Sequence, residues 1–408
     1  MYSFDIGAWA EDRAQAGTIH NDGSISLVAS IDGDNAGDFM AGVARMTSSG
    51  ELETSFHTDG KWEFDANAPD SDYDAFFAVK ARKDGSLLAC GTVNDSTAST
   101  IVSINNSGGL DTSFSTNGYH EFGGGSVDNC NSLHLNVDGS SYTVGQYTNE
   151  FFIARFDSRG SMPRQGSVNL SFGTAGSLLK DVSGADSGRS ILEVPEGMLL
   201  GGLNGTVDMV WLRYTLDGTA DTAFHTDGMH THDFAGSTDY IAAMALQTDG
   251  RVLSVGQASA ADFGIVRIHS DGSFDTSFHT DGALAQHLSG TDLAYYVVLQ
   301  TDGKAIVMGQ SGSQATVAMA RYHTSGALDT SFRTIGYVSE HTSTNAENLS
   351  DGFLETDGRL VASGYGHNGA QNTGRLFRYR TDGVLDTSFS TIGWAIHSYA
   401  GSAFGHIT

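Results

Sequence analysis

Two histidines of this sequence have a spacing that could bind a metal ion. His230 and His232 alternate in a strand-like segment, so both imidazoles would lie on one face, as zinc ligands often do. A second interpretation is structural, because His57, His225 and His279 occur in a recurring His-Thr-Asp-Gly turn whose first position also accepts serine or arginine. The sequence favours exposed turn histidines over a transition-metal site.

Carboxylates at alternating positions indicate a possible calcium loop. Asp32, Asp34 and Asp38 are separated by Gly33 and Gly37, which suits a bent oxygen-rich loop. The distal bidentate glutamate of a complete calcium loop is missing, so a polar hairpin loop stays open as the alternative. A second acidic loop, equally ambiguous, contains Asp65, Asp70, Asp72 and Asp74. No cofactor is predicted beyond calcium at these loops.

Catalytic motifs are missing from the sequence. It contains no Gly-x-Ser-x-Gly, no His-Glu-x-x-His and no glycine-rich phosphate loop. Polar residues of the expected innermost strands are varied enough to line a binding funnel, but no nucleophile is paired with a base. These residues are Gln15, Lys80, Asn131, His134, Arg189, Tyr295, Tyr296 and Asp351. The sequence therefore predicts a protein that is not an enzyme.

The elements that position these residues belong to a sevenfold repeat. A short phrase returns at each copy: a turn, usually an acid, two further residues, a phenylalanine, and then a turn ending in glycine. A fixed period of this size indicates one supersecondary unit that buries its apolar face against its neighbours. The phenylalanines are Phe56, Phe114, Phe172, Phe224, Phe278, Phe332 and Phe389.

Each repeat is typical of four antiparallel strands. In the second copy, residues 75–82 and 86–91 read as strands joined by an Asp-Gly hairpin turn, and residues 100–104 and 119–122 follow. Seven such units without helices predict an all-β, seven-bladed β-propeller; a solenoid is the competing array. We expect a single domain over residues 1–408, with repeats at about 14–65, 66–123, 124–182, 183–235, 236–289, 290–342 and 343–399.

The repeat resembles a known family. The pattern Gly-x-Leu-Asp-x-Ser-Phe-x-x-x-Gly, followed by Asp-Gly about 30 residues later, is similar to the delta-60 repeat of bacterial surface and secreted proteins. The resemblance covers all seven units. It implies a propeller-like β architecture and an extracellular setting, and it carries no catalytic residues.

Two residue types recur as structural candidates. We expect each phenylalanine to fill the gap between neighbouring blades, where its burial contributes about 2 kcal/mol or more. The third strand carries an arginine in every unit but the second, which has Ser103. We interpret these arginines as partners of the nearby acids rather than as a ring of anion-binding groups. They are Arg45, Arg155, Arg213, Arg267, Arg321 and Arg378.

Composition narrows the class of protein further. The formal net charge is −27, from 48 acidic and 21 basic residues, which disfavours nucleic acids and anionic membranes as partners. No apolar run is long enough to span a membrane, and no secretory signal is visible at the N-terminus. Cys90 and Cys130 lie in adjacent repeats, and we expect buried free thiols.

The sequence predicts a structural or recognition protein outside the cell or on a virion, binding other structural proteins, a surface receptor or a glycan through its loops. Since the chain begins and ends in repeat material, a phage tail or capsid-attached component is favoured over an anchored surface protein. The alternatives are an extracellular lyase or glycan hydrolase with a site at the propeller axis, and a lectin that uses tryptophans. Those tryptophans are Trp9, Trp62, Trp211 and Trp394.

The chain ends suggest a role in assembly. The short strand expected after each phrase has an additional copy at residues 2–6, so eight copies serve seven blades. We expect the two ends to meet at the junction of the first and last blades, where the spare strand pairs beside the ring or with a second subunit.

Overall fold

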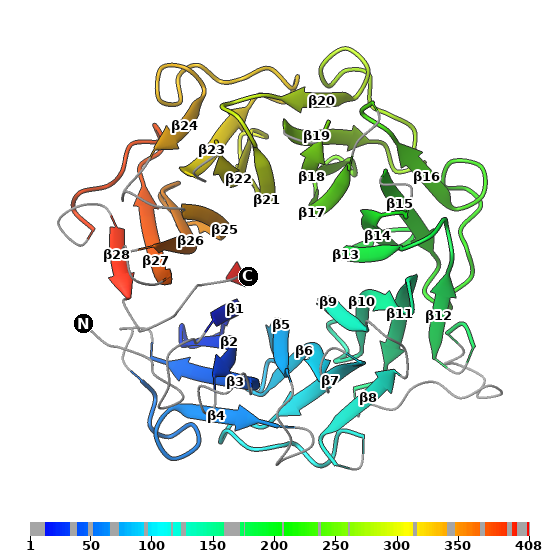
Figure 1. Cartoon of the computed structure of the whole chain (residues 1–408), viewed down its shortest axis with the longest axis vertical. Helices are drawn as coiled ribbons and strands as arrows, with labels where there is room; N and C mark the ends of the chain where they lie inside the picture. Colours follow the sequence, from blue (N-terminus) through cyan, green and yellow to red (C-terminus); the bar gives the residue numbers. More distant parts are fainter. Residues whose placement is uncertain are drawn as a thin grey trace. The chain divides into compact units, whose positions relative to one another are not determined.

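Seven antiparallel sheets form the blades of a seven-bladed β-propeller in the computed structural model (Figure 1), as the repeat predicts. The structure describes residues 13–32, 39–47, 52–65, 73–93, 97–115, 117–123, 128–158, 172–174, 176–205, 208–235, 238–259, 262–312, 316–340, 347–367, 372–389, 394–397 and 406–407. These residues contain no helix, and therefore none long and apolar enough to cross a membrane.

The first compact unit comprises residues 1–188 and 397–408 and contains three blades. Blade 1 consists of β1 (Arg13–Ile19), β2 (Ile25–Asp32), β3 (Phe39–Met46) and β4 (Lys61–Phe64). Blade 2 consists of β5 (Ala75–Ala81), β6 (Leu87–Val93), β7 (Ala98–Ile104) and β8 (Tyr119–Gly123). Blade 3 consists of β9 (Asn129–Leu135), β10 (Ser141–Tyr147), β11 (Glu150–Phe156) and β12 (Ser177–Lys180).

The second compact unit, Arg189–Ile396, contains the four remaining blades. Blade 4 consists of β13 (Ser187–Val194), β14 (Gly197–Leu203), β15 (Met209–Tyr214) and β16 (Met229–His232). Blade 5 consists of β17 (Tyr240–Leu246), β18 (Val252–Ala258), β19 (Asp262–Ile268) and β20 (Ala283–Gln286), and blade 6 consists of β21 (Leu293–Leu299), β22 (Ala305–Ser311), β23 (Thr316–Tyr322) and β24 (Tyr337–Glu340). Blade 7 consists of β25 (Glu347–Leu354), β26 (Leu360–His367), β27 (Asn372–Tyr379) and β28 (Trp394–His397).

A glycine near the end of the second strand holds the first two strands close together. A Cβ at Gly309 would lie 1.8 Å from the carbonyl oxygen of Leu293, and one at Gly256 would lie 1.8 Å from that of Tyr240. The first strand is irregular at this level, with a register shift between Ala294 and Tyr296 in blade 6. The glycine therefore permits a β-bulge that any larger residue would disrupt.

The two ends of a blade differ in their connections. At the end that we name the turn end, strands one and two are joined by five residues in every blade except blade 4, for example 82–86 and 247–251. Strands three and four are joined there by fourteen residues in every blade except blade 3. At the opposite loop end, the connection between strands two and three varies from two residues (148–149) to six (33–38).

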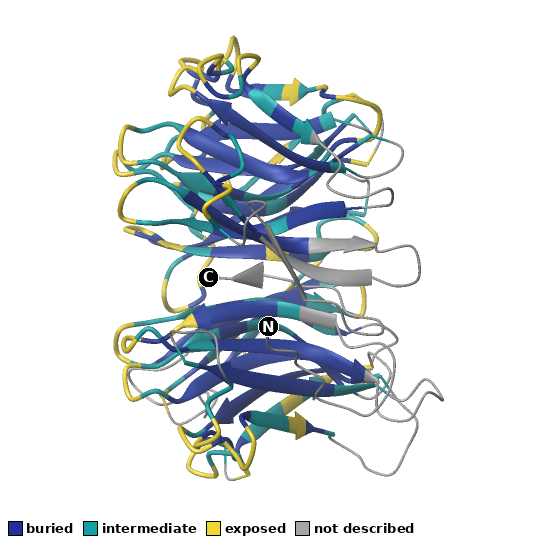
Figure 2. Ribbon diagram, turned by 90° about the vertical axis from the view of Figure 1, so that its left-hand side faces the viewer, coloured by how far each residue is buried: buried dark blue, intermediate teal, exposed yellow. Residues whose placement is uncertain are grey.

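The core lies between neighbouring sheets. Figure 2 shows buried strands, with exposed residues gathered at the tight turns. Six of the seven recurring phenylalanines, all but Phe389, are at most 2% exposed, whereas Phe389 is half-buried. Phe278 belongs to one cluster with Val255 of blade 5 and Val307 of blade 6, so this side chain packs between two sheets.

Cys90 and Cys130 form a disulfide, so the prediction of free thiols was wrong. Cys90 lies on β6 and Cys130 on β9, which places the bond between blades 2 and 3. The sequence placed the two cysteines in adjacent repeats, but it could not show that the second strand of one blade faces the first strand of the next at this position. The bond closes a loop of about 40 residues, for which chain entropy predicts about 4 kcal/mol of stabilisation.

The C-terminus contributes a strand that the sequence did not indicate. β29 (His406–Ile407) pairs in parallel with β1, opposite Ala16 and Gly17, and extends the sheet of blade 1 to five strands. β28 is the outer strand of blade 7. The spare strand predicted at residues 2–6 lies outside the described residues.

We expect Phe278→Ala to lower the free energy of unfolding by about 3–5 kcal/mol, because it leaves a cavity between two sheets. Phe389→Ala is the matched control and should cost clearly less, because Phe389 is only half-buried. Chemical denaturation of the two variants and the parent measures the difference. Equal losses for the two variants would contradict the role assigned to Phe278.

Candidate functional site

In most blades the recurring arginine fastens the turn end, best seen in blade 5, whereas Arg155 of blade 3 lies over the ring of Tyr142 instead. Arg267 Nε donates to the carboxylate of Asp275 at 2.7 Å, and its Nη2 donates to Ser277 Oγ at 3.0 Å. The guanidinium lies 4.9 Å from the ring centre of Phe278, and Nη1 donates to the carbonyl of Thr324 in blade 6. One side chain thus joins an ion pair, a cation–π contact and a hydrogen bond between blades.

The same arrangement recurs in neighbouring blades. Arg321 pairs with Asp329 at 2.8 Å, lies 4.7 Å from the ring of Phe332, and donates to the carbonyl of Thr381 in blade 7. Arg213 pairs with Asp221 and donates to the carbonyl of Ser270 in blade 5. The charges of these two guanidinium groups are therefore offset within the fold.

Blade 2 replaces the missing arginine from another strand. Ser103 occupies the usual position on β7, and Arg82, which follows β5, donates to its hydroxyl at 2.6 Å. The guanidinium of Arg82 lies 5.6 Å from the ring of Phe114, and Ser103 in turn bonds the carboxylate of Asp111. The blade thus retains a cation over its phenylalanine although the side chain comes from a different position.

The residue after the phenylalanine adds a second link between blades. His225, His279 and Arg333 adopt positive φ values of 54°, 54° and 51°. Their backbone N–H groups donate to the carbonyls of Asp271, Ser325 and Asp382 in the next blade. This explains the recurring histidine position: the backbone N–H of this residue makes the bond to the next blade, so the type of side chain can vary.

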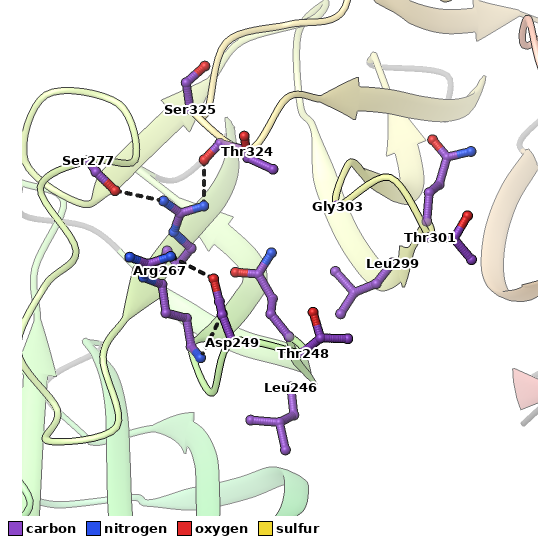
Figure 3. A pocket seen from close by; sticks show the side chains of 13 residues that line it. Leu246, Thr248, Asp249, Arg267, Ser277, Leu299, Thr301, Gly303, Thr324 and Ser325 are labelled. Carbon is purple, nitrogen blue, oxygen red and sulfur yellow. Dashed lines mark hydrogen bonds and ion pairs between the residues drawn. The ribbon is translucent and has the colours of Figure 1, made fainter.

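A pocket of about 540 Å³ lies at the turn ends of blades 5 and 6 (Figure 3). Its polar lining includes Gln247, Asp249, Arg251 and Gln300. Arg251 is paired with Asp249 at 2.6 Å, and Arg267 is held as described above. Because both arginines are paired with acids of the protein, the pocket offers little net charge to a ligand. Its lining residues include the arginine and serine that join the turn ends of neighbouring blades.

The loop end contains recurring buried acids, of which the sequence patterns above single out only Asp74. An acid stands before or at the start of the first strand and is 0% exposed in blades 2 to 7. Asp239 accepts the N–H groups of Phe234 and Ser259, and Asp128 accepts that of Thr148. The signal was present as an acid at the same place in each repeat. These acids are Asp74, Asp128, Asp186, Asp239, Asp292 and Glu347.

Among the described residues, one group brings three metal-binding side chains together. Asp262 begins β19, His287 follows β20, and Asp292 precedes β21. Their ligand atoms all lie within 4.8 Å of one another. The hydrogen bond that Asp262 accepts raises the pKa of His287, while burial opposes this rise and the negative charge of Asp292 supports it.

The metal sites considered from the sequence lie elsewhere. His230 and His232 share a face of β16 but make ring contacts, since His230 stacks on His225 at 4.4 Å and His232 packs edge-on against Phe234. The predicted calcium loop lies outside the described residues: residues 33–38 are not described, nor is the side chain of Asp32. In the second acidic loop, Asp74 is one of the buried acids.

The polar residues proposed for a binding funnel have varied surroundings. Arg189 is exposed and lies 4.3 Å from the ring of Tyr240, and Asn131 donates to the carbonyl of Gly188. Burial, with the negative charge and hydrogen bond of Asp351, raises the pKa of Tyr296 well above its usual range. These contacts hold the side chains in place and do not join a nucleophile to a base. Gln15, Lys80, His134 and Tyr295 are half-buried.

Comparisons with known proteins support the fold. A family model described as "Domain of unknown function (DUF5122) beta-propeller" matches residues 247–278, 300–332 and 355–389, which run from the hairpin turn to the phenylalanine of blades 5, 6 and 7. A propeller repeat family agrees with the predicted one, while the delta-60 name itself stays a prediction. A comparison with curated protein sequences finds no match.

A comparison with solved structures returns proteins of low sequence identity. The β-propeller domain of the Trilobed protease from Pyrococcus furiosus is 8% identical, with a TM-score of 0.43, over 91% of this chain and 94% of that one. Sqt1 from Chaetomium thermophilum is 11% identical, with a TM-score of 0.44, over 88% and 96%. A protein of unknown function from Dyadobacter fermentans is 11% identical, with a TM-score of 0.43, over 90% and 93%.

We expect acid to destabilise the fold through half-buried histidines. Burial lowers the pKa of His232, although nearby acids such as Asp239 oppose this. The unfolded chain therefore binds a proton near pH 6.5 that the folded chain resists, so this stability is complete above pH ~6.5 and is lost as the pH falls further.

Denaturation of the parent and of His232→Gln at pH 7 and pH 5 measures this effect. The loss between the two pH values should be smaller in His232→Gln, and unchanged in the control His323→Gln, whose side chain is 45% exposed. An identical loss in all three proteins would show that His232 does not carry the acid sensitivity.

Proposed function

We propose that this protein is a non-enzymatic structural and recognition protein that binds a partner through the loop ends of its blades, outside the cell or on a virus particle. The observation that carries this proposal is the difference between the two ends of a blade. Connections at the turn end keep one length in nearly every blade, whereas those between strands two and three range from two to six residues. Loops that vary on a repeated scaffold are a common means of binding partners.

The chemistry of the turn end supports the same choice of surface. Its arginines and acids bond one another and the backbone of the next blade, as Arg267 does with Asp275 and Thr324. Such side chains are not available to a partner without loss of the links between blades. The loop end carries no equivalent arginine network among the described residues, and its exposed side chains differ from blade to blade.

An oxidising setting is supported by the disulfide between Cys90 and Cys130. Disulfides form and persist in secreted, periplasmic and virion proteins and are rare in a reducing cytosol. The net charge of −27 favours solubility and repels nucleic acids and anionic membranes. Other structural proteins, a surface receptor or a glycan therefore suit the partner better.

Two tryptophans considered for a lectin site have structural surroundings. Trp211 is 0% exposed and donates from its indole nitrogen to Ser254 Oγ at 2.8 Å. Trp62 is half-buried and packs against the apolar cluster of blades 1 and 2. Trp9 and the side chain of Trp394 lie outside the described residues. The described tryptophans therefore give the lectin alternative no support.

Matched threonine-to-lysine pairs test which end binds. Thr238 and Thr291 are exposed at the loop ends of blades 4 to 6, and Thr248 and Thr301 are exposed at the turn ends of blades 5 and 6. We expect Thr238→Lys with Thr291→Lys to weaken co-sedimentation of the purified protein with cells and virions of its source at least about tenfold, because a long cation is introduced at the contact.

The control pair, Thr248→Lys with Thr301→Lys, should bind as the parent does. Immunogold labelling of the same samples shows whether the protein lies at the outer surface. Exclusively cytosolic labelling, or loss of binding in the turn-end pair alone, would contradict the proposal. Release of small products from the bound material would favour the alternative of an enzyme.

A further inference from the structure

Three polar side chains converge at the loop end between blades 5 and 6. His287 Nδ1 lies 2.8 Å from Asp262 Oδ1 and 3.5 Å from Asp292 Oδ2. Ligands at zinc-like distances of about 2.0–2.2 Å in a tetrahedral site lie about 3.3–3.6 Å from one another. The separation from Asp292 lies in this range, and that from Asp262 is about 0.5 Å shorter, so side-chain movements of this order would bring all three atoms onto one ion.

The carboxylate of Asp292 is already held in place. Asp292 is 0% exposed, its Oδ2 accepts the N–H of Leu288 at 2.6 Å, and its Oδ1 accepts the hydroxyl of Ser311 at 2.5 Å. The N–H of Ser289 adds a longer contact at 3.1 Å. Hydrogen bonds of this kind orient the carboxylate ligands of metal sites and reduce the cost of fixing them.

His287 is not required to satisfy this buried acid. At the start of blade 5 the equivalent acid, Asp239, is bonded by Phe234 and Ser259, and the residue that follows the fourth strand of the preceding blade 4 is Asp233. In blade 3 that position holds Asp181, beside the buried Asp186. This position therefore holds an acid in blades 3 and 4 and a histidine in blade 5, as it does in blade 6 with His341, and in blade 5 Asp262 supplies a second carboxylate.

The set of donor atoms selects a class of ion. One imidazole nitrogen and two carboxylate oxygens suit divalent first-row transition metals such as Zn²⁺, whereas Ca²⁺ and Mg²⁺ prefer oxygen alone. The side chain of His287 is 61% exposed and that of Asp262 is 23% exposed, so solvent reaches the group from one side. The fourth position of a tetrahedral ion would then be open to water or to a group from a partner.

From this geometry we propose that Asp262, His287 and Asp292 bind one divalent transition-metal ion, with Zn²⁺ as the probe. The ion would join the third strand of blade 5 and the connection after its fourth strand to the start of blade 6. It would thereby fix part of the loop end and present an exposed coordination position there. Without such an ion, His287 Nδ1 is hydrogen-bonded to the carboxylate of Asp262.

The test uses the full chain after removal of metal ions by chelation. Calorimetric titration with Zn²⁺ should show one tight site per chain in the parent, and Co²⁺ should give the visible absorption bands of a nitrogen- and oxygen-ligated ion. His287→Ala should weaken Zn²⁺ binding at least about tenfold and abolish the Co²⁺ bands. Asp262→Asn, which keeps the side-chain volume, should weaken binding as well.

The matched control is His323→Ala, since His323 is also exposed and faces a single acid, Asp329, at 3.6 Å. It should keep the affinity and spectrum of the parent. Because His287 is exposed, metal-free His287→Ala should melt as the parent does, which separates loss of the site from loss of the fold. A parent that takes up no Zn²⁺, or a His287→Ala variant with the affinity of the parent, would reduce the group to an ion pair and overturn the proposal.

Discussion

The blades depend on a positive charge placed over a buried phenylalanine and tied to the next blade. Burying an arginine alone would be costly, since the charge loses its water. Here the cost is offset because an acid of the same phrase accepts its Nε–H, the aromatic ring faces its plane, and a carbonyl of the next blade accepts a further N–H. Hydrogen bonds from Ser388, opposed by partial burial and supported by Arg378, lower the pKa of the corresponding Asp386 to about 2. The acid therefore stays charged over the physiological range.

This fastening explains why the two ends of a blade have diverged so differently. A change of length at the turn end would move the recurring phrase with its phenylalanine, the arginine, and the positive-φ residue that follows the phenylalanine. Each of these contacts the neighbouring blade. The loop end is held instead by a buried acid that accepts nearby backbone N–H groups, as Asp239 does. Such an acid constrains only the base of the connection, so the rest can vary in length and sequence, which is what a recognition surface requires.

The repeat made the fold predictable from the sequence, because one period determines the number of strands, the positions of the turns and the phenylalanines that pack between blades. Contacts that break the repeat were not predictable. Arg82 acts for the missing arginine from a different strand, and Cys90 bonds Cys130 across strands of different rank. The group of Asp262, His287 and Asp292 joins three separate segments, so no local motif announces it. The buried acids could have been found, since they recur at one position.

Moving the guanidinium of blade 2 from position 82 to position 103 tests most directly whether the positive charge over the phenylalanine holds the blades together. Arg82→Gln should lower the free energy of unfolding by about 1–3 kcal/mol, because Ser103, Asp111 and Phe114 lose a charged partner. Adding Ser103→Arg to that variant restores the arrangement of the other blades, and the account predicts recovery of most of the lost stability in a double-mutant cycle. If the two changes together cost as much as the sum of their separate effects, the charge over the phenylalanine is not what holds the blades together.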